Sequence, residues 1–172
     1  MVKIRPFKAS DKAVIEAVLH SWGGDFVVSR GRKSYPQNSP GFIAIGADGS
    51  YEGLISFEKR PGNEAEITLF EAVQQGQGTG RKLMKAALKH LKKSGFRKAY
   101  VISTNNNIQA FKFYQQSGFR PVAVYPDAMK TARRLKPSIP KICSNGLPIN
   151  DEILYELNLQ QKAKTIPKTP FK

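Results

Sequence analysis

The chain has 172 residues, of which 40% are hydrophobic and 10% aromatic, and this is enough for the core of one globular domain. A formal charge of +15, from 28 Lys and Arg against 13 Asp and Glu, favours an anionic partner, either nucleic acid or a small polyphosphate ligand. The single cysteine, Cys143, excludes a disulfide framework, a structural metal is not expected, and no apolar run reaches the roughly 18 residues of a membrane-spanning helix. We therefore expect a cytoplasmic protein without a metal and without membrane contact.

The first part of the chain predicts an antiparallel meander. Residues 2–7 alternate between apolar and charged and predict a strand, and Ser10 and Asp11 then predict the start of a helix that runs to Leu19. Residues 21–40 are rich in glycine, proline and other turn formers and predict a long loop, with room for one short element of secondary structure. Three antiparallel strands are expected next, at residues 42–45, 53–57 and 65–70.

The second part predicts helices alternating with strands. From Gly78 to Leu91 apolar residues recur every three or four positions, with basic residues between them, so an amphipathic helix is expected to end at Gly95. This helix is a crossover, so the strand before it and the strand after it should be parallel. The remaining elements are expected as strands at 98–103, 119–125 and 151–159, and as helices that begin after Asn107 and at Asp127.

Together these elements predict an α/β (α+β) fold with a mixed central sheet of about six or seven strands, flanked by helices. We expect one domain over residues 1–160. Residues 161–172 are polar and basic with two prolines, and are expected to form a flexible tail.

A glycine-rich turn joins the strand at 65–70 to the amphipathic helix. Residues 75–81 read Gln-Gly-Gln-Gly-Thr-Gly-Arg, and alternating glycines before a helix let backbone N–H groups approach a bulky anion. No Lys-Ser or Lys-Thr pair follows the last glycine, as a P-loop requires, and the glycine spacing does not fit a dinucleotide-binding turn. The turn therefore predicts a phosphate site of another kind.

Two motifs in this sequence resemble those of the GNAT acetyltransferase superfamily. The family pattern Q/R-x-x-G-x-G/A is matched by residues 75–80, and N-x-x-A-x-x-x-Y-x-x-x-G-F is matched by Asn107, Ala110, Tyr114, Gly118 and Phe119. Further segments resemble an uncharacterised bacterial subgroup. The resemblance implies a GNAT fold and an acetyl-CoA-dependent N-acetyltransferase, in which an amine attacks the thioester directly and Cys143 is dispensable.

The resemblance also implies which residues bind acetyl-CoA. Tyr114 corresponds to the general acid that protonates the departing thiolate, and it contacts the coenzyme. The backbone of residues 68–70 should face the pantetheine arm and the acetyl carbonyl, the turn should bind the pyrophosphate, and Asn107 should bind the pantetheine arm. The expected coenzyme residues are Thr68, Leu69, Phe70, Gln75, Gly76, Gln77, Gly78, Thr79, Gly80, Arg81, Asn107 and Tyr114.

The general base and the acceptor are less defined by the sequence. An amine with a pKa near 10.4 must lose a proton before it attacks, but the position of the glutamate that serves some family members is Ile102. Glu66 and Glu71 are the remaining candidates. Glu66 is preferred, acting through water, because strand alternation would place it on one face with Thr68 and Phe70. The acceptor is expected at the loop 21–40, with candidate contacts from Trp22, Arg30, Arg32 and Tyr35.

The net charge of +15 is also compatible with a second function. The chain could be a non-catalytic basic module that binds CoA or nucleic acid, although both coenzyme motifs are intact. The preferred partners are acetyl-CoA and an amine of a small molecule or a peptide. A homodimer is compatible with the sequence, which fixes neither the oligomeric state nor the acceptor.

Overall fold

The structure, a computed structural model, describes residues 2–160, so the tail predicted at 161–172 lies outside the described residues. The strands are β1 (Lys3–Pro6), β2 (Val27–Ser29), β3 (Arg32–Ser34), β4 (Gly41–Ile45), β5 (Tyr51–Arg60), β6 (Glu64–Ala72), β7 (Lys98–Thr104), β8 (Arg120–Tyr125) and β9 (Glu152–Asn158). The helices are α1 (Lys12–Ser21), α2 (Thr79–Lys93), α3 (Ile108–Gln116) and α4 (Ala128–Leu135), with 3₁₀ turns at Ala9–Asp11 and Pro36–Asn38. Within the described range, none of these helices is long and apolar enough to cross a membrane.

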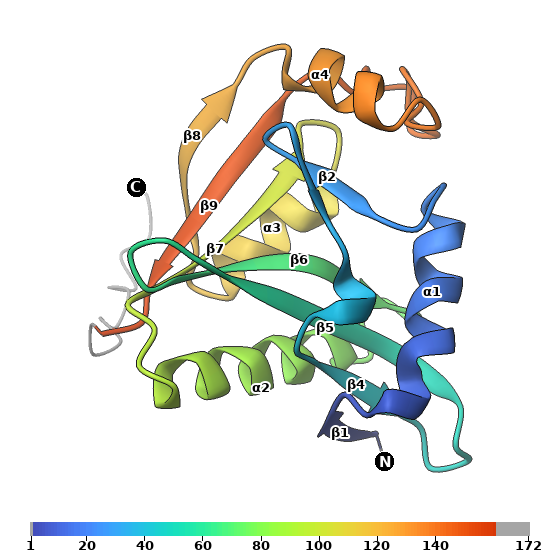
Figure 1. The fold of residues 1–172 in the computed structure, drawn as a ribbon, viewed down its shortest axis with the longest axis vertical. Coiled ribbons are helices and arrows are strands. Elements are labelled where there is room, and N and C mark those ends of the chain that lie inside the picture. The colour runs from blue at the N-terminus through green and yellow to red at the C-terminus, as the bar shows by residue number, and fades with distance from the viewer. Residues whose placement is uncertain (1, 161–172) are drawn as a thin grey trace, which may run out of the picture.

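Seven strands form one mixed sheet in the order β1-β4-β5-β6-β7-β9-β8 (Figure 1). Neighbouring strands are antiparallel, except for β6 and β7, which are parallel and are connected through α2. Both the mixed sheet and its parallel pair are therefore confirmed. The last strand, β9, lies between β7 and β8, so the end of the described chain is built into the sheet rather than onto its edge.

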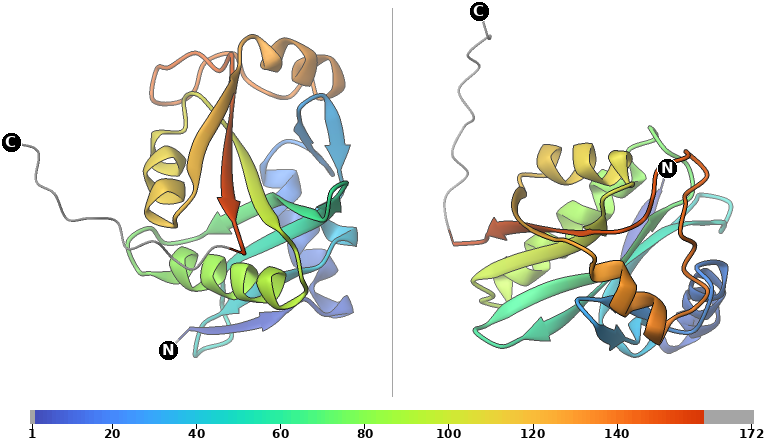
Figure 2. Two further views of the ribbon diagram at one scale, coloured as in Figure 1. Left: turned by 90° about the vertical axis from the view of Figure 1, so that its left-hand side faces the viewer. Right: turned by 90° about the horizontal axis from the view of Figure 1, so that it is seen from above.

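Helices cover both faces of the sheet (Figure 2). On one face, Leu83 and Leu91 of α2 are fully buried and belong to the same apolar cluster as Ile67 of β6, because the three- and four-residue spacing in α2 places its apolar side chains in one stripe. On the other face, Leu19 of α1 packs with Leu69 of β6 in a second cluster. The sheet thus separates two layers, with α2 and α3 on one side and α1 on the other.

The segment 21–40, predicted as a long loop, contains a two-stranded hairpin of β2 and β3. It is joined by the two-residue turn Arg30-Gly31, in which both residues have positive φ angles of 49° and 68°. This is the backbone combination of the tight turn that matches the twist of a hairpin. The hairpin lies over the same face of the sheet as α1, and α4 packs against β2 (Figures 1 and 2).

A β-bulge interrupts β6 at its centre. Ser56 of β5 pairs with Leu69, but the next residue of β5, Phe57, pairs with Ile67. Thr68 is therefore an extra residue without a partner of its own on β5, and such an insertion bends the strand and increases its twist.

The bulge changes which side chains share a face. Glu66 and Thr68 point to the hairpin side, and Leu69, which strand alternation would place on the opposite side, also packs there with α1. Phe70 then faces α3, where its ring stacks on Phe113 with 5.0 Å between the ring centroids. The expectation that Glu66 shares a face with Phe70 is therefore wrong, because alternation was counted through an inserted residue.

The pairing between β6 and β7 ends at the bulge. Residues Glu64–Ile67 of β6 pair with Lys98–Val101 of β7, and no pairs follow beyond Ile67 and Val101 in these two described strands. The edge of β6 that faces β7 therefore carries unpaired backbone groups from Thr68 onward. Backbone donors and acceptors of this kind need another partner.

Candidate active site

A pocket of about 450 Å³ lies between the glycine-rich turn, the end of β6 and α3, and we call it the glycine-turn pocket. The predicted site residues that line it are Phe70, Gln75, Gly76, Gly78, Gly80, Arg81, Asn107 and Tyr114. It is completed by Ala72, Gln74, Gln109, Ala110, Lys112, Phe113 and Gln116. The two sequence motifs, about thirty residues apart in the chain, thus meet at one cavity.

Glycine is required at positions of this turn for two different structural reasons. Gly76 and Gly78 have φ angles of 81° and 79°, in the left-handed region that residues with a Cβ rarely adopt. Gly80 is the first-turn residue that packs closely: a Cβ there would lie 3.2 Å from Cζ of Phe70. The turn therefore depends on glycine both for its backbone path and for the approach of α2 to the aromatic side chains.

The start of α2 presents free backbone donors to the pocket. The N–H of Lys82 donates to the carbonyl of Gly78 at 3.0 Å, and the N–H groups of the three residues before Lys82 precede the first intrahelical bond. The first turn of α2 holds no acidic residue, while Arg81 lines the pocket. Free donors, the helix dipole and a nearby guanidinium together suit a phosphate or pyrophosphate group.

Four of the predicted coenzyme residues do not line the pocket with their side chains. The Thr68 hydroxyl hydrogen-bonds with the Ser56 hydroxyl at 2.9 Å, and Leu69 is in the core beside α1. Thr79 is buried and its hydroxyl has no partner among the described residues, and Gln77 is outside the lining. Thr68 and Leu69 can therefore reach a ligand in this pocket through backbone groups, which is the contact expected from the sequence for residues 68–70.

Tyr114 lies at the inner wall of the glycine-turn pocket. Its ring packs among aromatic rings, with centroids 5.3 Å from Tyr155, 6.0 Å from Phe119 and 6.5 Å from Phe70. Burial raises the pKa of the Tyr114 phenol well above its ordinary value, so the group stays protonated at neutral pH. A protonated phenol is a proton donor, but aromatic neighbours give no charge stabilisation to a tyrosinate.

Asn107 is both a helix cap and a wall of the pocket. Its Oδ1 accepts a hydrogen bond from the Ala110 N–H at 3.0 Å, which satisfies a free donor at the start of α3. This bond fixes the side chain while the amide also lines the pocket. Its Nδ2 group can donate to a ligand without disturbing the cap.

A second pocket, of about 420 Å³, lies under the β2–β3 hairpin on the opposite face of the sheet, and we call it the arginine pocket. Its lining residues are Arg30, Arg32, Arg60, Pro61, Glu64 and Tyr100. Two residues predicted for the acceptor, Arg30 and Arg32, are therefore brought together here by the hairpin that the sequence analysis missed.

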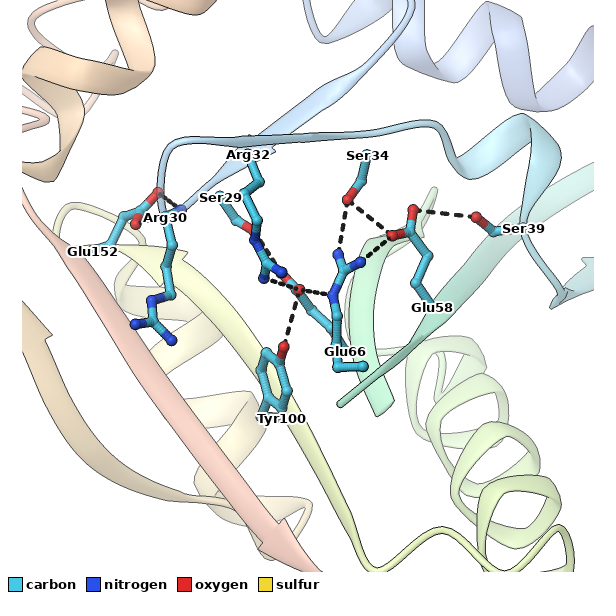
Figure 3. A network of polar contacts seen from close by, with 10 residues as sticks. Ser29, Arg30, Arg32, Ser34, Ser39, Glu58, Glu66, Tyr100 and Glu152 are labelled. Carbon is cyan, nitrogen blue, oxygen red and sulfur yellow. Dashed lines mark hydrogen bonds and ion pairs between the residues drawn. The ribbon is translucent and has the colours of Figure 1, made fainter. Parts of the chain in front are cut away.

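Glu66 is buried beside the arginine pocket in a network of polar contacts (Figure 3). Its Oε2 accepts from Arg60 at 2.7 Å and from Arg32 at 3.1 Å. Its Oε1 accepts from the Ser29 hydroxyl at 2.5 Å, and the Tyr100 hydroxyl donates to Oε2 at 3.2 Å. Two guanidinium groups and two hydroxyls thus occupy the lone pairs of this carboxylate, and protonation of Glu66 would break both ion pairs.

The other predicted residues lie elsewhere on the same face. Glu71, five residues further along β6, accepts from the indole N–H of Trp22 at 3.0 Å, so these two predicted residues are brought together outside the arginine pocket. Burial and the nearby Glu71 charge raise the pKa of the Tyr51 phenol. Tyr35 packs against Phe26 with 6.1 Å between ring centroids and lines neither pocket.

Glu152 is a buried carboxylate that the sequence analysis passed over. It accepts from the backbone N–H of Arg30 at 2.9 and 3.2 Å, and forms no ion pair among the described residues. Burial raises the pKa of the Glu152 carboxyl, and the nearby Glu66 charge adds to this effect, while the Arg30 N–H opposes it. The sequence did contain a signal for Glu152, since an acidic residue begins the apolar strand 152–155. A carboxylate in such a strand is expected to be buried, and carboxylates are rarely buried without a role.

Comparison with known proteins identifies relatives of the chain. Residues 12–119 match the model of the acetyltransferase (GNAT) family. Uncharacterized protein YdhI of Bacillus subtilis (strain 168) is 36% identical over 115 residues, which cover 67% of this chain and 71% of that protein. Uncharacterized protein YxbD of the same strain is 34% identical over 122 residues, covering 70% of this chain and 75% of that protein.

Solved structures share the fold. An IAA acetyltransferase from Bacillus cereus ATCC 14579 superposes with a TM-score of 0.69 at 21% identity, covering 92% of this chain and 99% of that chain. A Bacillus subtilis acetyltransferase in complex with CoA superposes with a TM-score of 0.66 at 18% identity, covering 92% of this chain and 99% of that chain. These identities are low, so the likeness is one of architecture.

Proposed function

We propose that this chain, which belongs to the acetyltransferase (GNAT) family, moves the acetyl group of acetyl-CoA to an amine by direct attack on the thioester. Family membership makes it an acyltransferase; the direct route and the amine acceptor are the proposal. The observation that carries the proposal is the unpaired edge of β6 after Ile67, which has the glycine-turn pocket on one face of the sheet and the arginine pocket on the other. A donor and an acceptor can approach this edge from opposite sides.

The donor would bind in the glycine-turn pocket. Its pyrophosphate would take hydrogen bonds from the backbone N–H groups at the start of α2, with the Arg81 charge beside it. Its pantetheine arm carries amide groups that can pair with the free backbone groups of residues 68–70, and Asn107 can bind the same arm. The acetyl carbonyl would then lie at the bulge, next to the Tyr114 side of the pocket.

The reaction needs one proton to leave the amine and one to reach the sulfur. The amine nitrogen attacks the carbonyl carbon, the new C–N bond forms, and the C–S bond breaks to release the thiolate of CoA. Tyr114, which lines the glycine-turn pocket, would give its phenolic proton to that thiolate. Because its pKa is raised, this transfer is unfavourable if the tyrosinate persists, so Tyr114 must regain a proton from water after the thiol has formed. The proton that the attacking amine loses goes to a separate acceptor.

The proton acceptor for the amine is a carboxylate on the hairpin side of the sheet. Glu66 stays fixed between Arg32 and Arg60, and its charge orders the wall of the arginine pocket. We assign the proton acceptor to Glu152, acting through water, because within residues 2–160 its only hydrogen-bond donor is a backbone N–H, and an added proton breaks no ion pair there. Glu71 accepts a hydrogen bond from the Trp22 indole and would hold Trp22 in place on the hairpin side of the sheet, outside the arginine pocket.

A panel of primary amines, followed by mass spectrometry of the acetylated products, tests the proposal. We expect turnover with acetyl-CoA by the wild-type chain and a large loss of turnover in Tyr114→Phe. Absence of any acetylated product across amines, amino acids, polyamines and peptides, with the folded protein and saturating acetyl-CoA, would refute transfer to an amine.

A further inference from the structure

We propose that the acceptor amine carries an anionic group, a carboxylate or a phosphate, which the guanidinium groups of Arg30 and Arg32 bind in the arginine pocket. This inference rests on the proposed function, whose acceptor it narrows to one chemical class. Both arginines line the same pocket and keep guanidinium donors that the described part of the chain does not use.

The three arginines of the pocket differ in how far the protein satisfies them. Arg60 contacts Glu58, Glu66 and Ser34 and its side chain is only 15% exposed, so its part is structural. Arg32 uses one nitrogen on Glu66 and its side chain is 47% exposed. Each guanidinium has five donors, so Arg32 keeps several for a ligand.

Arg30 has no carboxylate partner at all within residues 2–160. Cζ of the Arg30 guanidinium lies 4.6 Å from the centroid of the Tyr125 ring. Figure 3 shows the Arg30 side chain extending from the hairpin on the side of the sheet that carries Tyr100. An aromatic ring holds a guanidinium in place without using its in-plane donors. Those donors remain directed outward in the plane of the group.

The backbone at Arg30 is unfavourable for an arginine. Its φ of 49° is in the left-handed region, where a residue other than Gly, Asn or Asp loses about 1 kcal/mol or more. Two-residue hairpin turns normally carry Asn or Gly at this position. The turn is nevertheless held in place, because the Arg30 N–H donates to the buried Glu152 carboxylate. A strained residue held by a buried partner is typical of a functional position.

The charge around the pocket favours an anion. Of its lining residues, three are arginines and one, Glu64, is acidic, and Glu64 is paired with Lys98 at 3.5 Å. Arginine forks match carboxylates and phosphates geometrically, better than any other side chain. Glu66 lies two residues before Thr68, or about 7 Å along the strand, so an anion bound here leaves a tethered amine within reach of the bulge.

The kinetic test compares acids with their uncharged amides. Each acceptor in the series is an amino acid with a different spacing between amine and carboxylate, assayed beside its carboxamide, and aminoalkyl phosphates form the second arm. For the best spacing we expect kcat/KM to be about tenfold or more higher for the anion than for the amide, the factor that one lost charge-assisted contact gives. Equal kcat/KM for anions and amides would overturn the inference. The series with the higher kcat/KM, amino acids or aminoalkyl phosphates, shows whether the pocket prefers a carboxylate or a phosphate.

The matched variants are Arg30→Asn and Arg134→Gln, which each remove one positive charge. Asn is suited to the left-handed turn, so Arg30→Asn should keep or raise the Tm, and Arg134 is exposed on α4 outside both pockets. We expect Arg30→Asn to bring the ratio of anion to amide kcat/KM close to one, and Arg134→Gln to preserve it. An unchanged ratio in Arg30→Asn would contradict the assignment.

Binding without turnover keeps the inference testable apart from the proposed function. Isothermal titration of CoA-saturated protein with glutarate and with inorganic phosphate should show binding by wild type and Arg134→Gln, weakened about tenfold or more in Arg30→Asn. Equal binding by all three proteins would refute the anion site. If no amine is acetylated but binding is lost in Arg30→Asn, the proposed reaction fails while the anion site stands.

Discussion

The backbone N–H of Arg30 donates to both oxygens of the Glu152 carboxylate, at 2.9 and 3.2 Å, between residues 122 positions apart in the chain. This contact connects the turn of the β2–β3 hairpin to β9 and holds in place the hairpin residues that line the arginine pocket. It gives Glu152 a neutral partner rather than a cation. The carboxylate is therefore held in a position where its charge is disfavoured, as its raised pKa shows.

Glu152→Gln should stabilise the protein near neutral pH by about 0.5–2 kcal/mol, the usual range for a stabilising substitution. The folded state favours the protonated carboxyl, so this group stabilises the fold below the unfolded pKa of about 4.3 and loses that contribution as pH rises through the folded pKa. Glutamine keeps an oxygen for the Arg30 N–H. Unfolding in urea at pH 4 and at pH 8 measures the effect, which should appear only at the higher pH.

The same variant tests the proton acceptor. If Glu152 takes the amine proton, Glu152→Gln should lower kcat by about 10²–10⁴-fold and remove the acidic limb of the pH profile of kcat/KM. That limb should lie above the ordinary glutamate range in wild type, because the pKa is raised. An unaltered limb in the variant would move the role to another carboxylate, and Glu66→Gln is the comparison.

Tyr114→Phe should reduce kcat about 10²-fold or more with little change in Tm. Phenylalanine retains the ring that packs on Phe119 and Tyr155, so only the hydroxyl group and the proton it carries are lost. Steady-state kinetics with circular dichroism melting separates the two effects. A drop in Tm with unchanged kcat would mean that Tyr114 is a core residue alone.

Gly78→Ala and Gly95→Ala form a matched pair for the glycine turn. Both glycines have φ near 80°, and at neither would a Cβ meet an atom within 4 Å, so each substitution should cost about 1 kcal/mol of stability through the backbone alone. Only Gly78 lines the glycine-turn pocket. We expect KM for acetyl-CoA to rise severalfold or more in Gly78→Ala and to stay unchanged in Gly95→Ala; equal values in both would remove the turn from donor binding.

Cys143→Ala should leave kcat within about twofold of wild type, since direct transfer involves no acyl-cysteine and Cys143 lines neither pocket. Hydrogen bonds from the backbone of Asn145 and from neighbouring groups lower the pKa of the Cys143 thiol, which favours the thiolate, the form that reacts with thiol reagents. Colorimetric assays of released CoA should therefore use this variant. Loss of activity with the fold intact would contradict the direct route.

The residues that line the glycine-turn pocket were predictable from the sequence because they lie in short local stretches. The glycine turn, the start of α2 and the Asn107–Tyr114 spacing lie within short stretches, and periodicity locates the helices that carry them. The order of the strands was not predictable beyond the crossover pair. Nothing in the local pattern of β9 indicates that it enters between β7 and β8.

The arginine pocket was predictable only in part because it depends on long-range contacts. The hairpin strands have three residues each, too few to show a period-two pattern. The first position of the turn is left-handed but carries Arg30, so the sequence lacks the Asn-Gly or Gly-Gly pair that would predict a hairpin turn. The bulge at Thr68 has no sequence signature in an apolar strand, yet it reverses the side on which Phe70 lies. Glu152 acquires its partner from the other end of the chain.

The pairing between β6 and β7 ends early and, within the described residues, leaves one edge of β6 without a strand partner after Ile67. In the proposed function a bound pantetheine arm would pair with the backbone groups after Ile67 that lack a strand partner, so the donor would complete the hydrogen bonding of this sheet edge. Folding and donor binding are then thermodynamically linked. At a donor concentration of 100 times Kd, the folded state should gain about 2.7 kcal/mol, and the slowing of amide exchange should be greatest at residues 68–70.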